Sequence, residues 1–138
     1  KANIVLPAAN DKLNKGETVC IITYGMGVYW SKTAAVKFPG QVEILDLRTL
    51  FPLDEELIFE TVNKHGKCIV LSEEQQNNSF AESLAHRITY NCFMQLDAPV
   101  EVMGAMNLPA VPINLALEAA MLPTPEKLVQ RLQALLNF

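Results

Sequence analysis

Several short groups of residues in this sequence could take part in chemistry, and the first is a glycine-containing turn. Tyr24-Gly25-Met26-Gly27 follows an apolar run and precedes a helical pattern. Such a turn can hold a phosphate on the backbone N–H groups that begin a helix, although no third glycine follows at the dinucleotide-binding spacing. Glycines that only let the chain turn tightly explain the same residues. The turn therefore predicts either a phosphate site or a tight connection.

Charged residues lie where two predicted strands end. Arg48 follows Asp46 by two positions, and Glu73 and Glu74 follow another apolar run. Sites in open parallel sheets form at the carboxyl ends of strands, so Arg48 could bind an anion, or pair with Asp46 or with an interface residue. Neighbouring strand residues point to opposite faces, so Glu73 and Glu74 are not a preformed acid–base pair. We expect one of them to face an interface and the other to face solvent.

The histidines and cysteines show no catalytic or metal-binding spacing. His65 falls at a predicted helix end, and His86 falls among the polar positions of another helix. Cys20 and Cys68 lie inside apolar runs, and with Cys92 they give an odd number at no metal-ligand spacing. We therefore expect free, buried thiols, no metal site and no catalytic histidine in this chain.

Composition and charge narrow the class of protein. The chain has 138 residues, of which 50% are hydrophobic, and its formal net charge is −4. This is typical of one globular domain, and no basic patch of the kind that binds nucleic acid is visible. No apolar stretch approaches the ~20 residues that a membrane-spanning helix needs. We expect neither nucleic acid nor a membrane as a partner.

Strand and helix patterns alternate along the chain. Apolar and β-branched runs predict strands at 18–24, 42–47, 67–71 and 99–103. Helical patterns lie between and after them, and Asp54, Ser79 and Thr124 are the residues expected to cap three of these helices. The alternation predicts an α/β fold with an open, mostly parallel sheet and helices on both faces. Residues 1–15 are expected to be a linker from an upstream domain, and residues 16–138 the domain itself.

Five segments carry a resemblance to a known family, and they lie at 16–25, 42–54, 69–74, 96–100 and 117–123. In order and spacing they resemble the transketolase C-terminal domain family. The segments Asp46-Leu-Arg-Thr-Leu-x-Pro-Leu-Asp54 and Leu96-Asp-Ala-Pro99 are most similar to the β subunit, or fused β part, of 2-oxoacid dehydrogenases. Residues 75–79 depart from the glycine-rich turn usual in that family, and Ile113 stands where an aromatic residue often follows a Pro-x-Pro pattern.

The resemblance implies a three-layer α/β/α domain whose mostly parallel sheet contains one antiparallel strand. It also implies that thiamine diphosphate, magnesium, and the catalytic glutamate and histidines belong to upstream domains of a longer enzyme. This chain would then hold no cofactor and would not catalyse a reaction alone. The parent enzyme would oxidatively decarboxylate pyruvate or a branched-chain 2-oxoacid, in the cytoplasm or, in a eukaryote, in the mitochondrial matrix.

The partners that the resemblance implies are a second β part, an α subunit or fused α part, and the basic peripheral-subunit-binding domain of a lipoyl acyltransferase. Arg48, Glu73 and Glu74 are the expected contact for self-association. Asp97 is expected to meet the acyltransferase, together with the carboxylate of Phe138 if the chain ends there naturally. The alternative for Asp97 is a turn residue whose side chain binds nearby backbone N–H groups.

Two other interpretations remain open. The chain could be the equivalent domain of a transketolase or a deoxyxylulose-phosphate synthase, which needs no acyltransferase. It could also be a free-standing anion- or nucleotide-binding module that uses Tyr24, Gly25 and Arg48. A thiamine-binding Gly-Asp-Gly motif upstream would separate the thiamine enzymes from the free-standing module.

Overall fold

A five-stranded sheet runs through the middle of the domain in the order β1-β3-β2-β4-β5. The computed structural model describes residues 1–8, 16–105 and 122–138. Its strands are β1 (Asn3–Leu6), β2 (Val19–Thr23), β3 (Val42–Asp46), β4 (Cys68–Gln75) and β5 (Glu101–Ala105). Neighbouring strands are parallel except β1, which is antiparallel to β3. The mostly parallel sheet with one antiparallel strand is thus confirmed.

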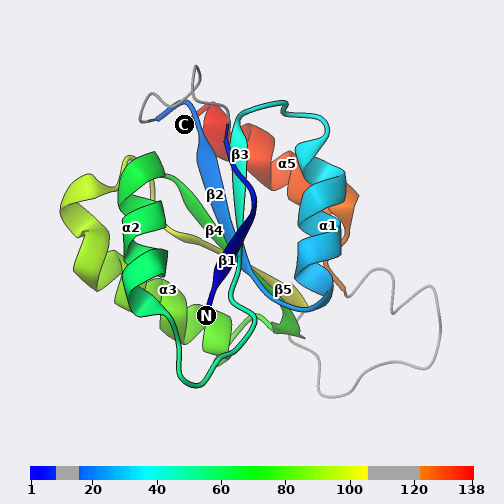
Figure 1. Cartoon of the computed structure of the whole chain (residues 1–138). Coiled ribbons are helices and arrows are strands. Elements are labelled where there is room, and N and C mark those ends of the chain that lie inside the picture. The colour runs from blue at the N-terminus through cyan, green and yellow to red at the C-terminus, as the bar shows by residue number, and fades with distance from the viewer. Residues whose placement is uncertain (9–15, 106–121) are drawn as a thin grey trace, which may run out of the picture.

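Helices cover both faces of the sheet (Figure 1). One face carries α1 (Met26–Ala35) and α5 (Pro125–Leu136), and the other carries α2 (Glu55–His65) and α3 (Phe80–Cys92). A short 3-10 turn, η2 (Phe93–Gln95), continues α3 toward β5. The arrangement is the three-layer α/β/α fold expected from the sequence.

The apolar runs fill two cores because side chains alternate along each strand. In β2, Val19 and Ile21 pack toward α1 and α5, whereas Cys20 and Ile22 pack toward α2 and α3. All four side chains are fully buried. A strand covered on both faces needs apolar residues at every position, which is why β2 reads as a continuous run rather than an alternating one.

Three helices begin where their capping residues predict. Asp54, Ser79 and Thr124 each accept a hydrogen bond from the backbone N–H three residues later, at 3.3, 3.2 and 3.2 Å. The Glu82 carboxylate accepts from the N–H of Asn78 rather than from that of Ser79, so the reciprocal bond that would complete a capping box with Ser79 does not form. Gly66 ends α2 in the left-handed conformation at φ 75°.

Two boundaries of the strands differ from the expectation. Residues 3–6, inside the segment expected to be a linker, form an edge strand of the sheet, because β1 pairs with β3 from Asn3 to Leu6. Strand β4 runs to Gln75, beyond the apolar run that ends at residue 71, so Glu73 and Glu74 are among its last residues. Part of the 117–123 segment that resembles the family, and Ile113, lie outside the described residues.

Candidate functional site

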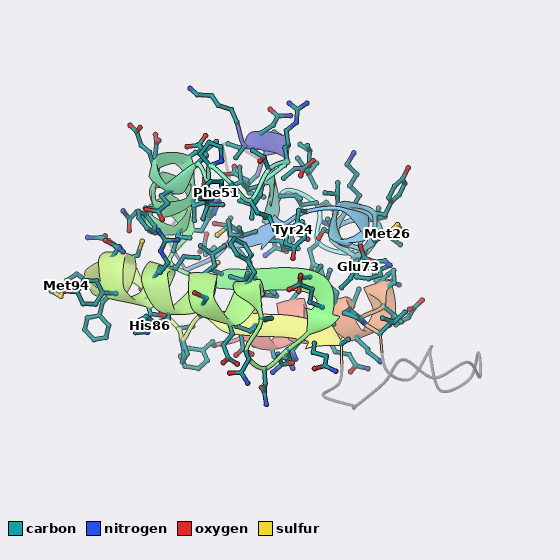
Figure 2. The ribbon with its side chains drawn as sticks, turned by 90° about the horizontal axis from the view of Figure 1, so that it is seen from below. Tyr24, Met26, Phe51, Glu73, His86 and Met94 are labelled. Atoms are coloured by element: carbon teal, nitrogen blue, oxygen red, sulfur yellow. The ribbon has the colours of Figure 1, made fainter. Side chains whose placement is uncertain are left out.

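The carboxyl ends of β2, β3 and β4 form one edge of the sheet, which we call the carboxyl edge. The candidate residues Tyr24, Arg48, Glu73 and Glu74 lie at this edge. Seen from this side, Tyr24 lies between Phe51 and Met26, and Glu73 lies beside Met26 (Figure 2). The Met26 N–H donates to Oε1 of Glu73 at 3.4 Å, so a carboxylate already lies at the start of α1. A bound phosphate would meet this negative charge at the N–H groups it needs. The tight-connection interpretation of the glycine turn is therefore the better one.

The two positions of this turn are occupied by glycine for different structural reasons. Gly25 adopts φ 59°, a left-handed conformation that favours glycine. A Cβ on Gly27 would lie 1.9 Å from Oγ1 of Thr23, so only glycine lets α1 approach β2 this closely. The Thr23 hydroxyl itself donates to the carbonyl of Leu71 at 2.9 Å. Close packing thus accounts for the pattern without any ligand.

Tyr24 and Ser72 have buried hydroxyl groups with no hydrogen-bond partner among the described residues. The Tyr24 ring packs edge-on against Phe80, with centroids 6.2 Å apart. Burial, followed by the negative charge of Glu74, raises the pKa of Tyr24, and the nearby Ser72 hydroxyl partly opposes the rise. Tyr24 is therefore a neutral phenol at physiological pH and not a general base.

Arg48 does not pair with Asp46 through its side chain. Oδ1 of Asp46 accepts from the backbone N–H of Arg48 at 3.0 Å, and Arg48 adopts φ 63°. The Arg48 side chain is exposed and forms no ion pair with any described residue. Phe51, in the same connection, is 95% exposed. Glu73 and Glu74 are exposed as well, so the expectation that one of them is covered remains a proposal about an interface.

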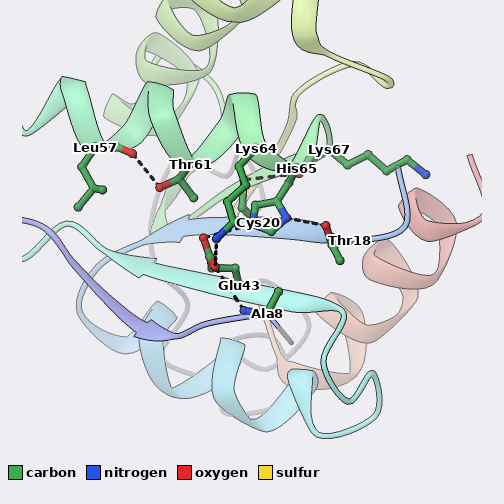
Figure 3. A network of polar contacts seen from close by, with 9 residues as sticks. All are labelled: Ala8, Thr18, Cys20, Glu43, Leu57, Thr61, Lys64, His65 and Lys67. Atoms are coloured by element: carbon green, nitrogen blue, oxygen red, sulfur yellow. Dashed lines mark hydrogen bonds and ion pairs between the residues drawn. The ribbon is translucent and has the colours of Figure 1, made fainter. Parts of the chain in front are cut away.

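A buried polar network, which the sequence did not reveal, links α2 to the amino-terminal part of the sheet (Figure 3). His65 lies at its centre and is fully buried. Its Nδ1 shares a hydrogen bond of 2.6 Å with Oγ1 of Thr18. Its Nε2 is 3.1 Å from Oε2 of Glu43, an ion-pair distance, although the ring N–H does not point well enough for a hydrogen bond.

Glu43 is almost completely buried and is held by three groups. Oε1 accepts from Nζ of Lys64 at 3.2 Å and from the Ala8 N–H at 3.3 Å, while Oε2 faces His65. Burial is the largest single influence and favours the neutral acid, but the contacts with His65, Ala8 and Lys64 outweigh it. Together they lower the pKa of Glu43 to about 2. The carboxylate is therefore ionised in the core.

Thr18, His65 and Glu43 follow one another as hydroxyl, imidazole and carboxylate, the order of a hydrolase triad. Their side chains are 1% exposed or less, so no substrate reaches the Thr18 hydroxyl. The network therefore stabilises the fold and does not perform nucleophilic catalysis. Sequence patterns could not predict this network. Glu43 fits a strand pattern and His65 fits a helix end, and neither pattern indicates that the two residues meet.

The opposite edge of the sheet, at the amino ends of the parallel strands, is called the amino edge. It holds the other residues expected to contact partners. Asp97 is exposed, and its backbone N–H donates to the carbonyl of Gly66 at 2.8 Å. The C-terminus lies at this same end of the sheet (Figure 1), and Phe138 is 73% exposed. Met94, in η2 three residues before Asp97, is 85% exposed. The structure thus separates Arg48, Glu73 and Glu74 from Asp97 and Phe138.

The cysteines are free and buried, as the sequence predicts. Cys20 and Cys68 are register partners on β2 and β4, and burial raises the pKa of Cys20 well above its usual value. Within residues 1–8, 16–105 and 122–138, no group of three or more His, Cys, Asp or Glu side chains is placed to bind a metal ion. No helix in the same residues is long and apolar enough to cross a membrane.

Comparisons with known proteins place this chain in a family. The family model for the transketolase C-terminal domain matches residues 9–128. The 2-oxoisovalerate dehydrogenase β subunit of Bacillus subtilis is 30% identical over 97% of this chain and 42% of that subunit. The pyruvate dehydrogenase E1 β subunit of Rhizobium meliloti is 29% identical over 96% of this chain and 29% of that subunit.

A further relative and a solved structure extend the comparison. The β subunit of a Bacillus subtilis acetoin:2,6-dichlorophenolindophenol oxidoreductase is 34% identical over 86% of this chain and 35% of that subunit. A split-gene transketolase, described as an inactive β4 tetramer, superimposes with a TM-score of 0.69 at 17% identity, over 99% of this chain and 42% of that one. This chain spans less than half the length of each of these proteins, and it belongs to the transketolase C-terminal domain family.

Proposed function

We propose that this chain is the C-terminal assembly domain of a thiamine-diphosphate-dependent 2-oxoacid dehydrogenase. The observation that carries the proposal is the match to β subunits of two such dehydrogenases over nearly the whole chain. In this proposal the cofactor and magnesium are bound upstream, and the domain supplies contact surfaces. Pyruvate and branched-chain 2-oxoacids both remain candidate substrates, since the two β subunits match at nearly the same identity.

The experiment that tests this function uses the full-length protein, combined with its α subunit where that is a separate chain, with thiamine diphosphate and magnesium. Reduction of an artificial electron acceptor is followed with pyruvate, with 3-methyl-2-oxobutanoate and with a ketose phosphate in parallel. We expect turnover with a 2-oxoacid. Turnover with the ketose phosphate only, assayed by transfer of its two-carbon unit, would favour the transketolase alternative and overturn the proposal.

Self-association is assigned to the carboxyl edge. The choice is supported by the exposed Arg48 side chain, which forms no ion pair with the residues that the structure describes, by the exposed carboxylates of Glu73 and Glu74, and by the exposed ring of Phe51. Aromatic residues and arginine are enriched in interface cores. The proposed edge also suits contact with an α subunit or fused α part. Sedimentation of the full-length protein as a species with a single β part would contradict the proposal.

Docking to the acyltransferase is assigned to the amino edge. Asp97 offers an exposed carboxylate there, and the carboxylate of Phe138 would add a second charge if the chain ends naturally at that residue. Met94 and Phe93 lie close by in sequence and are exposed, which provides apolar area beside the charge. A basic binding domain would pair with Asp97 through arginine or lysine side chains.

A further inference from the structure

We infer that His65 is a positioning residue that holds Asp97 in place at the amino edge. The inference rests on the proposed docking role of Asp97, and it explains what holds Asp97 in position. The His65 side chain is fully buried within this chain, so any effect it has on docking passes through the backbone around it.

Two backbone hydrogen bonds connect the His65-Gly66 pair to the surroundings of Asp97. The Gly66 carbonyl accepts from the Asp97 N–H at 2.8 Å, and the His65 carbonyl accepts from the Gly16 N–H at 3.3 Å. The carboxylate lies near Gly16, because a Cβ added to that glycine would be 3.6 Å from Oδ2 of Asp97. The Asp97 backbone is therefore bonded directly to Gly66, and Gly16, which lies near its carboxylate, is bonded to His65.

The His65 imidazole ring fixes the position of these backbone atoms. Gly66 has a left-handed φ of 75° and no side chain, so it cannot fix the direction of its own carbonyl by packing. His65, the residue before it, is held on one side by Thr18 and on the other by Glu43. Thr18 is also two residues from Gly16, so the same ring bonds to the segment that lies near the Asp97 carboxylate.

The direct test is hydrogen–deuterium exchange of peptides containing Asp97 in the full-length protein. His65→Gln removes the ring, and Thr18→Val leaves the ring in place but removes its 2.6 Å partner. We expect exchange at Asp97 to rise about fivefold in each variant, the change that loss of one ordinary hydrogen bond produces. Thr18→Ser keeps the hydroxyl and should leave the exchange unchanged.

Thr61→Val is the matched control, because Thr61 is a buried hydroxyl residue on α2 whose 2.7 Å hydrogen bond goes to the Leu57 carbonyl of its own helix. It should alter overall stability without a selective change at Asp97. If Thr18→Val and His65→Gln raise exchange at Asp97 no more than Thr61→Val does, the positioning role is wrong. Thr18→Val decides the question even if His65→Gln does not fold.

A double-mutant cycle separates positioning from general destabilisation. Affinity for the acyltransferase binding domain is measured for Thr18→Val, Asp97→Asn and the double variant in the full-length protein. Thr18→Val should weaken binding about threefold when Asp97 is present, and by no measurable factor in the Asp97→Asn background. An equal loss in both backgrounds would overturn the inference. If Asp97→Asn alone leaves affinity unchanged, the docking proposal fails, and the exchange measurement still decides whether His65 positions Asp97.

Discussion

Glu43 and Asp97 are carboxylates in opposite environments. Glu43 is buried, and it is ionised because three groups hold it. Replacing it removes a contact that Lys64 and His65 make. Asp97 is exposed, and only its backbone is held. A buried paired charge affects stability, whereas an exposed charge at the rim of an interface affects the association rate and its salt dependence.

Asp97→Asn is the prediction for the exposed carboxylate. In the full-length protein we expect weaker binding of the acyltransferase binding domain and a smaller dependence of affinity on salt, because one attractive charge is lost. A buried charge left unpaired on the partner would cost roughly 2–5 kcal/mol, and a rim charge less. The measurement is calorimetry at two salt concentrations. Unchanged affinity and salt dependence, with the fold intact, would remove Asp97 from the docking surface.

Glu43→Gln is the prediction for the buried carboxylate. The folded pKa of about 2 lies below the ordinary glutamate value. Glu43 therefore stabilises the fold fully above about pH 4.5, and this stability is lost as pH falls through about 2. Urea unfolding should show the variant less stable by roughly 1–3 kcal/mol at pH 7, with the gap narrowing by pH 3. Glu56→Gln, an exposed change on α2, is the control. A gap that stays constant with pH would contradict the assignment.

At the scale of elements, most of the fold could be predicted because its signals are local. A continuous apolar run marks β2, a mainly apolar run marks β3, and the caps at Asp54, Ser79 and Thr124 mark helix starts. β1 was missed because a strand of four residues, followed by a polar stretch, carries no periodicity of its own and is ordered by pairing with β3. The His65–Glu43 contact was missed because it joins positions far apart in sequence.

The β2–α1 connection gives a prediction at this scale. Gly27→Ala should destabilise the fold by about 1–3 kcal/mol, because the new methyl group would overlap Oγ1 of Thr23. Thr23→Ala removes that atom, so Gly27→Ala should cost less in the Thr23→Ala background. The free energy of unfolding in urea, measured for the four proteins of this cycle, checks the interpretation. Equal costs in both backgrounds would show that the glycine serves another purpose.

At the scale of the whole molecule, the sheet presents two separate edges for contact. The carboxyl edge carries Arg48, Glu73 and the exposed ring of Phe51, and the amino edge carries Asp97 and Phe138. A domain that uses one edge for a second β part and the other for an acyltransferase could make both contacts at once. Under the proposal made above, its contribution would be to geometry and assembly, and the reaction would take place in upstream domains.

The central claim, that this domain assembles an enzyme whose cofactor is bound elsewhere, is tested most directly by one calorimetric titration. Thiamine diphosphate and magnesium are added to this 138-residue chain and, in parallel, to the full-length protein. The account predicts binding to the full-length protein, combined with its α subunit where that is a separate chain, and no measurable binding to the 138-residue chain alone. Binding to the isolated chain at micromolar concentrations would contradict it, because the domain would then hold the cofactor itself.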